Sequence, residues 1–195
     1  MTRTRRELAR TARRLTIERG LAGFTIDELC EIVGVSRRTF FNYFPSKEDA
    51  VVGHAADGLD DEALELFVAM RTRVDGISPN LLDYLAAVAI ASVGPEFEES
   101  PDGGLDDPGA VVAREPQLLA RFTTAGAEVE ARLVNAVERR EGLLPGDPVA
   151  RTAVLLIGTL IRDAAERRLR HETASFADAL LDSVADAKRL LQPER

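Results

Sequence analysis

The chain has 195 residues, 45% of them hydrophobic and 30% charged, which is the balance of a globular protein with ample sequence for a buried core. Its net charge of −8 excludes a protein that is basic throughout, yet the charge is segregated: residues 1–50 carry +3 and residues 51–195 carry −11. Such segregation indicates a basic head that faces a polyanion, attached to an acidic body.

Cysteine usage and hydropathy exclude further classes of protein. The single cysteine, Cys30, cannot form an internal disulfide, and its place on an apolar helix face favours a buried side chain in a reducing cytoplasm. No stretch approaches the roughly 18 uninterrupted apolar residues of a membrane helix, and the arginine-rich start is unlike a signal peptide. We therefore expect a cytoplasmic protein with no membrane partner.

Every predicted element is helical. The first helix covers residues 2–19, and its inward residues are Leu8, Ala12 and Leu15. Gly20 ends this helix, and Phe24 is expected to plug the core of the head.

The next stretch predicts a helix-turn-helix. Thr25-Ile26-Asp27-Glu28 is a capping box, in which the threonine oxygen accepts an orphan N–H and Glu28 reaches back. The apolar stripe of this helix consists of Ile26, Leu29, Cys30 and Val33. Gly34 follows directly, where the backbone must turn with positive φ, and Ser36 is a good N-cap for a second helix that Pro45 stops. Two short helices joined by such a glycine turn form a helix-turn-helix.

The second helix of this motif divides into two sides. Its inner side is expected to consist of Phe40, Phe41 and Phe44, and its outward residues are Arg37, Arg38, Thr39, Asn42 and Tyr43. Two guanidiniums, an amide, a hydroxyl and a phenol are the groups that bind base edges and phosphates in DNA.

The string TIDELCEIVGVSRRTFFNYFPSKEDA, residues 25–50, resembles the DNA-binding signature of TetR/AcrR-type transcriptional regulators. The chain departs from the family pattern at Arg38, where glycine is usual, at Phe41, which replaces tyrosine, and at Val33, which replaces a common alanine. The resemblance covers about a quarter of the chain. It implies a DNA-binding regulator that binds a palindromic operator as a dimer, most often as a ligand-responsive repressor.

For duplex DNA we expect Arg37 and Arg38 to contact guanine. Asn42 and Tyr43 are expected at phosphates or adjacent bases. The expected phosphate anchors are Thr25, Ser36, Thr39 and Lys47. In a dimer the two recognition helices would enter successive major grooves, so the operator should be an inverted repeat.

The rest of the chain predicts a helical body. Ser46 caps a helix that starts after Pro45, whose pattern Gly53 and Gly58 interrupt, and this helix is the expected lever between head and body. Helices are then expected at about 60–76, 79–93, 116–141, 147–170 and 175–191, and the Gly- and Pro-rich residues 94–109 are expected to form a loop. The fold class is therefore all-α, with a helix-turn-helix domain at 1–50 and an effector-binding and dimerisation domain at 51–195.

The penultimate helix is apolar on more than one side, so it must bury both sides. The resemblance implies that it forms a four-helix bundle with the last helix and their two copies in a homodimer. The residues proposed for this interface are Val149, Ala153, Leu156, Leu160, Phe176, Leu180 and Val184. The alternative is a helix at the centre of a monomer's own core.

A small hydrophobic effector fits the body better than a sugar, because the body offers few specific hydrogen-bonding groups. Candidate lining residues are Phe67, Leu85, Val88, Phe97, Leu118, Phe122 and Val129, each of which can equally be an ordinary core residue. No catalytic or metal-ligand pattern emerges, so we expect no enzyme activity, no metal and no cofactor. An all-helical small-molecule-binding or scaffold protein with a merely structural helix-turn-helix remains the alternative function.

Overall fold

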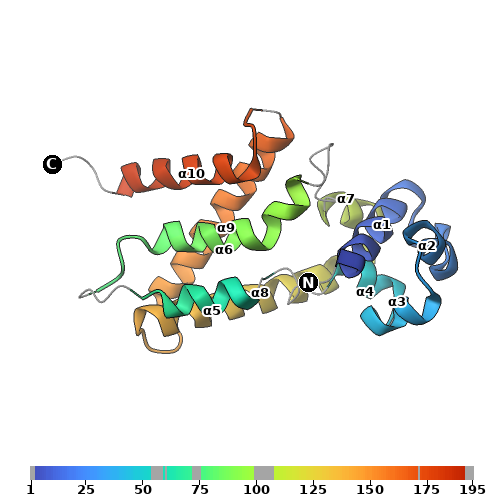
Figure 1. Cartoon of the computed structure of the whole chain (residues 1–195), viewed down its shortest axis with the longest axis horizontal. Coiled ribbons are helices and arrows are strands. Elements are labelled where there is room, and N and C mark those ends of the chain that lie inside the picture. The colour runs from blue at the N-terminus through green and yellow to red at the C-terminus, as the bar shows by residue number, and fades with distance from the viewer. Residues whose placement is uncertain are drawn as a thin grey trace. The chain divides into compact units, whose positions relative to one another are not determined.

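A computed structural model describes residues 3–53, 59, 61–71, 76–98, 108–170 and 172–191 (Figure 1). Over these residues every regular element is a helix, as predicted. The elements are α1 (Arg3–Arg19), η1 (Leu21–Gly23), α2 (Ile26–Val33), α3 (Arg37–Tyr43), α4 (Lys47–Val52), α5 (Asp61–Ala69), α6 (Leu81–Glu98), α7 (Pro108–Arg114), η3 (Pro116–Leu118), α8 (Leu119–Glu141), α9 (Pro148–Leu169) and α10 (Phe176–Leu191), where η marks a 3-10 helix.

The chain forms two compact units. The head unit comprises Met1–Gly58 together with Leu105–Val129, and the body unit comprises Leu59–Gly104 together with Glu130–Arg195. Helix α8 therefore contributes its first half to the head unit and its second half to the body unit. The sequence places the end of the DNA-binding domain at residue 50. As a division by function this boundary stays a prediction, and the compact head unit takes in a later segment as well.

The head unit has one apolar core, built mainly from α1 to α4. Leu8, Leu29, Phe40 and Phe44 have no exposed surface, and Phe24 plugs this core as predicted, with 3% of its surface exposed. Because α1 packs against both α2 and α4, the helix-turn-helix rests on a continuous apolar base.

The segment 105–129 supplies part of that core from far along the sequence. Val111 and Leu118 are buried among the residues of α1 to α4, and Phe122 packs against them. Two polar contacts hold the segment in place: the Leu21 N–H donates to Glu115 Oε1 at 2.6 Å, and Arg121 Nη1 pairs with Asp49 Oδ1 at 2.7 Å. No local sequence pattern predicts this packing.

The body unit is built from α5, α6, the second half of α8, α9 and α10. Helix α10 packs against both α9 and α6 (Figure 1).

A buried arginine, Arg140, joins three of the helices. Its Nη1 donates to the Phe67 carbonyl, its Nε pairs with Glu141 at 3.1 Å, and its guanidinium lies 4.2 Å from the centre of the Tyr84 ring.

Two predicted boundaries are wrong. Helix α5 ends at Ala69 and does not run on to Gly76, and Arg71, two residues beyond its end, donates to the Glu141 carbonyl at the end of α8. Helix α6 continues to Glu98, so the first residues of the predicted loop 94–109 are helical. Residues 108–109 open α7, and residues 99–107 lie outside the described part of the chain.

Candidate nucleic-acid interface

Local capping fixes the two helices of the helix-turn-helix. Thr25 Oγ1 accepts the Glu28 N–H at 3.1 Å, and Ser36 Oγ accepts the Thr39 N–H at 3.0 Å, so both predicted N-caps are present. The Glu28 carboxylate does not complete the predicted capping box, because it pairs with Arg19 at 2.6 Å.

Gly34 forms the turn between α2 and α3 with φ 76° and ψ 35°. A Cβ added there would meet open space, so the left-handed backbone is the reason for glycine at this position. The Val35 N–H then bonds to the Cys30 carbonyl at 2.9 Å, which closes the end of α2.

Helix α3 presents the predicted polar side to solvent. Arg37, Arg38 and Asn42 are exposed, whereas Phe40 and Phe44 are completely buried beneath them. Thr39 and Tyr43 are half-buried at the margins, and Tyr43 packs partly against the head core.

Phe41 is the exception on this helix. The predicted inner position beside Phe40 and Phe44 is wrong for this residue, because 45% of its surface is exposed. Phe40 and Phe44 are four residues apart and define the inner side. Phe41 lies about 100° around the helix from Phe40 and therefore points outward.

The two neighbouring arginines of α3 are held differently. Arg37 Nη1 donates to both carboxylate oxygens of Asp27, at 2.9 and 3.0 Å, so α2 fixes its orientation. No ion pair or hydrogen bond joins the Arg38 guanidinium to another described residue. Arg38 is therefore the outward cation of α3 most available to a phosphate or a base.

Lys47 and Thr39, two of the predicted phosphate anchors, already have partners. Lys47 Nζ donates to the Phe24 carbonyl at 2.7 Å and lies 4.6 Å from the centre of the Phe24 ring. The Thr39 hydroxyl bonds to Ser36 Oγ at 2.8 Å. Thr25 and Ser36 are exposed at the starts of α2 and α3, where backbone N–H groups also face solvent.

Cys30 behaves as the sequence predicts, as a buried apolar side chain. Burial, and then the nearby Asp27 carboxylate, raise the pKa of its thiol, and the Arg37 charge opposes this shift. The thiol therefore stays protonated and unreactive near neutral pH.

The residues predicted at a dimer interface separate into two groups. Phe176, Leu180 and Val184 are buried inside their own chain, and Ala153 is 8% exposed, which favours the alternative of an internal core for these positions. Val149 is 43% exposed, and Leu156 and Leu160 are half-buried. The apolar surface that the two helices do expose lies one position away from the predicted stripes and includes Leu155 and Leu181, at 53% and 50%.

The structure does not gather the predicted ligand-lining residues in one place. Phe67, Leu85 and Val88 are buried in the body unit, whereas Leu118 and Phe122 belong to the core of the head unit. Val129 is half-buried on α8, and the side chain of Phe97 lies outside the described residues.

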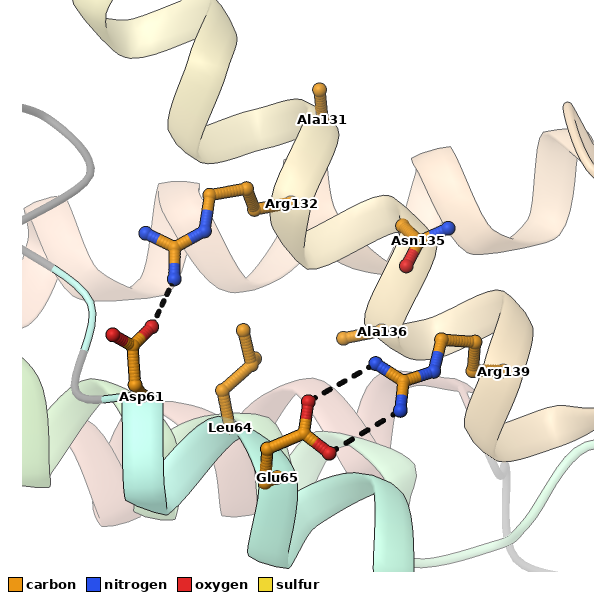
Figure 2. A pocket seen from close by; sticks show the side chains of 8 residues that line it. All are labelled: Asp61, Leu64, Glu65, Ala131, Arg132, Asn135, Ala136 and Arg139. Atoms are coloured by element: carbon orange, nitrogen blue, oxygen red, sulfur yellow. Dashed lines mark hydrogen bonds and ion pairs between the residues drawn. The ribbon is translucent and has the colours of Figure 1, made fainter.

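The body unit has an open cleft of about 570 Å³ between α5 and α8. It is lined by Asp61, Leu64, Glu65, Ala131, Arg132, Asn135, Ala136 and Arg139. Figure 2 shows two ion pairs across it: Arg132 with Asp61, and Arg139 with Glu65 at 3.1 Å. Leu64 lies between these pairs and Ala136 lies beside the second pair, and both are apolar residues that line the cleft.

The described residues lack two further features. No group of three or more histidine, cysteine or carboxylate side chains among them could hold a metal ion. Within the same part of the chain, none of the helices has the length and hydropathy to cross a membrane.

Comparison with known proteins agrees with this geometry. Residues 8–51 match the family of bacterial regulatory proteins named after tetR, and this stretch covers most of α1 through most of α4. The HTH-type transcriptional regulator TcmR of Streptomyces glaucescens is 28% identical over 196 residues, which cover 98% of this chain and 84% of TcmR.

A crystal structure from Mesorhizobium loti, of a protein assigned to the TetR family of transcriptional regulators, shares the fold. It has a TM-score of 0.55 and 20% identity, with 98% of each chain covered. Sequence motif and relatives therefore agree on the first of the two functions that the sequence left open: the chain carries a DNA-binding domain of the tetR type at residues 8–51 and is similar over its length to a transcriptional regulator.

Proposed function

We propose that this regulator is a ligand-responsive repressor that binds an inverted-repeat operator as a homodimer. The observation that carries the proposal is the outward side of α3, where Arg38 and Asn42 stand exposed over the buried Phe40 and Phe44. A rigid short helix with exposed cationic and amide groups is the element that enters a major groove in helix-turn-helix proteins.

The DNA contacts follow from this placement. Arg38 can form two hydrogen bonds to guanine. Arg37 can do the same once its guanidinium breaks its hydrogen bonds to Asp27 or divides its N–H groups between Asp27 and the base. Asn42 is one turn beyond Arg38 on the same side and suits an adenine or a phosphate. Tyr43, Thr25, Ser36 and Thr39 surround these groups as candidate phosphate contacts. Lys47 contributes positive charge near the N-terminus of α4, although its ammonium group is tied to Phe24.

We assign dimerisation to the exposed apolar side of α9 and α10. Thr152, Leu155, Leu156 and Thr159 follow helical spacing on α9, and Leu181 is the exposed leucine in the middle of α10. A Cβ added at Gly158 would meet nothing within 4 Å in its own chain, which leaves room for the close approach of a second helix. The buried Phe176, Leu180 and Val184 then support this surface from inside.

We assign the effector to the body unit and retain the expectation that it is a small, largely hydrophobic molecule. The cleft between α5 and α8 is the first place to test, because Leu64 and Ala136 offer apolar contact. Phe67 is buried on the same helix as Leu64, so an effector that enters deeper would reach the predicted Phe67, Leu85 and Val88 only by separating packed side chains.

Control by an effector requires two conformations with different affinities for DNA. Helix α4 is the proposed lever, and contacts within the head unit fix its position. Arg13 on α1 donates to the Val51 and Val52 carbonyls at the end of α4, and Arg121 pairs with Asp49 at its start. A change that pulls Arg121 away would release one end of α4 and alter how the head presents α3. We further propose that the protein acts in the cytoplasm and has no enzymatic activity.

The test is selection of bound fragments from random duplex DNA, followed by sedimentation of the complex. We expect an inverted repeat whose half-sites are centred roughly 34–36 Å apart, or somewhat further, with two chains on each duplex. Hydrophobic metabolite pools should release the enriched duplex. An enriched sequence without two-fold symmetry, or one chain on each duplex, would contradict the dimeric proposal.

A further inference from the structure

The recognition helix carries one side chain that its polar chemistry does not explain. Phe41 lies among Arg37, Arg38 and Asn42 on the outward side of α3 and exposes 45% of its surface. A phenylalanine has no group that can bond to a phosphate, so the neighbouring polar contacts assign it no role.

The Phe41 ring is held in place on two sides. It meets the buried Phe40 edge to face, with ring centroids 5.3 Å apart and planes at 87°. The Arg37 guanidinium lies 5.4 Å from the centre of the Phe41 ring, and Asp27 in turn fixes that guanidinium. These two contacts orient the ring while it stays outside the core. An apolar group that is both exposed and oriented is suited to binding.

The major groove offers one apolar group on its base edges, the 5-methyl group of thymine. Because Phe41 follows Arg37 by one helical turn, a base pair beside the one that Arg37 contacts comes opposite the ring. We propose that Phe41 determines operator specificity by packing against a thymine methyl group next to a guanine read by Arg37. This inference rests on the proposed binding of the operator through α3.

The test removes the methyl group from the DNA. The duplex enriched by selection is compared with the same duplex in which deoxyuridine replaces thymidine, first at all positions and then one position at a time. Loss of one buried methyl group should weaken binding of the wild-type protein roughly fourfold per half-site. One thymine in each half-site, beside a guanine, should account for most of the loss.

Two variants complete the experiment. Phe41→Ala should bind the thymidine and deoxyuridine duplexes equally, because the group that senses the methyl is gone. Ile32→Ala, which removes another exposed apolar side chain from the same unit, should retain the wild-type difference. Circular dichroism checks that Phe41→Ala keeps the helical fold, as expected for a half-exposed position.

The outcomes separate two kinds of failure. In the first kind, selection enriches a duplex, but the wild-type protein binds its thymidine and deoxyuridine forms equally. This result would overturn the role of Phe41 and leave the proposed operator binding intact. That role would also be overturned if Phe41→Ala kept the full difference, or if the half-site had no invariant thymine. If no duplex is enriched at all, the proposed operator binding fails, and this inference fails with it.

Discussion

The helix-turn-helix and the α9–α10 pair are both built from short-range helix signals, but they expose opposite chemistry. Ser36 caps the start of α3 and Ser175 caps the start of α10, each with a side-chain oxygen that accepts an N–H at 3.0 Å. Helix α3 then exposes guanidinium and amide groups over buried rings, whereas α9 and α10 expose leucines over a buried apolar core.

The difference indicates what each surface binds. An exposed polar helix over a rigid core suits a hydrated, negatively charged groove. Exposed leucines on two adjacent helices suit an apolar surface, and a second copy of the same pair supplies one. The predictions below test this contrast, in order of decreasing effect.

The largest effect should come from Leu180→Glu. Leu180 has no exposed surface, so a carboxylate there would be buried without a partner and would lower the free energy of unfolding by about 4 kcal/mol or more. Urea denaturation measures this change. Leu181→Glu, at the neighbouring half-exposed position, is the control and should leave the unfolding free energy of the monomer nearly unchanged. Equal destabilisation by both substitutions would contradict the assignment of the buried side.

The next largest effect concerns association. Leu155→Glu or Leu181→Glu should weaken dimerisation by about 2 kcal/mol or more, the loss typical of a hot-spot residue. Sedimentation equilibrium should then detect folded monomers. Leu144→Glu, in the loop before α9 with 80% of its surface exposed, should keep the wild-type mass. A dimer that tolerates both substitutions on α9 and α10 would place the interface elsewhere.

On the other side of the comparison, Arg38→Ala should reduce discrimination between the selected duplex and a scrambled one by about 1–3 kcal/mol. Fluorescence anisotropy with both duplexes measures this. Lys47→Ala should weaken binding to both duplexes alike if its charge acts on phosphates. Equal losses on every duplex for Arg38→Ala would show that Arg38 contacts only the phosphate backbone.

The smallest effect should come from the caps. Ser36→Ala and Ser175→Ala each remove one N-cap and should each cost about 1 kcal/mol of stability. Only Ser36→Ala should also weaken operator binding, because it loosens the helix that faces DNA. Thermal unfolding measures the stability of the two variants, and fluorescence anisotropy measures their affinity for the operator. Similar losses of DNA affinity in both variants would contradict the claim that the helix-turn-helix binds DNA and the α9–α10 pair does not.

The sequence predicts the fold best where signals are local. Thr25, Gly34 and Ser36 determine the helix-turn-helix through bonds that span only three to five residues, so the motif could be recognised without tertiary information. The caps of α9 and α10 are predicted equally well, since Asp147 and Ser175 act on their own first turns.

Tertiary packing sets the limit of such prediction. Helical spacing separates Leu180 from its neighbour Leu181, but only the packing of α10 against α6 and α9 shows that the stripe with Leu180 is buried within its own chain. Glu115 accepts a bond from Leu21, 94 residues away, and no pattern in the sequence points to that pairing. The placement of Leu118 in the head core was unpredictable for the same reason.

Helix α3 is the element that should meet DNA, and all the proposed base contacts with the operator lie on it. Amide hydrogen exchange of the whole protein, with and without the selected duplex, tests this most directly. We predict slowed exchange at the start of α2 and along Ser36–Phe44, and no direct slowing at the exposed sides of α9 and α10. Protection confined to the body unit, with unchanged exchange along α3, would contradict the claim that α3 binds the operator.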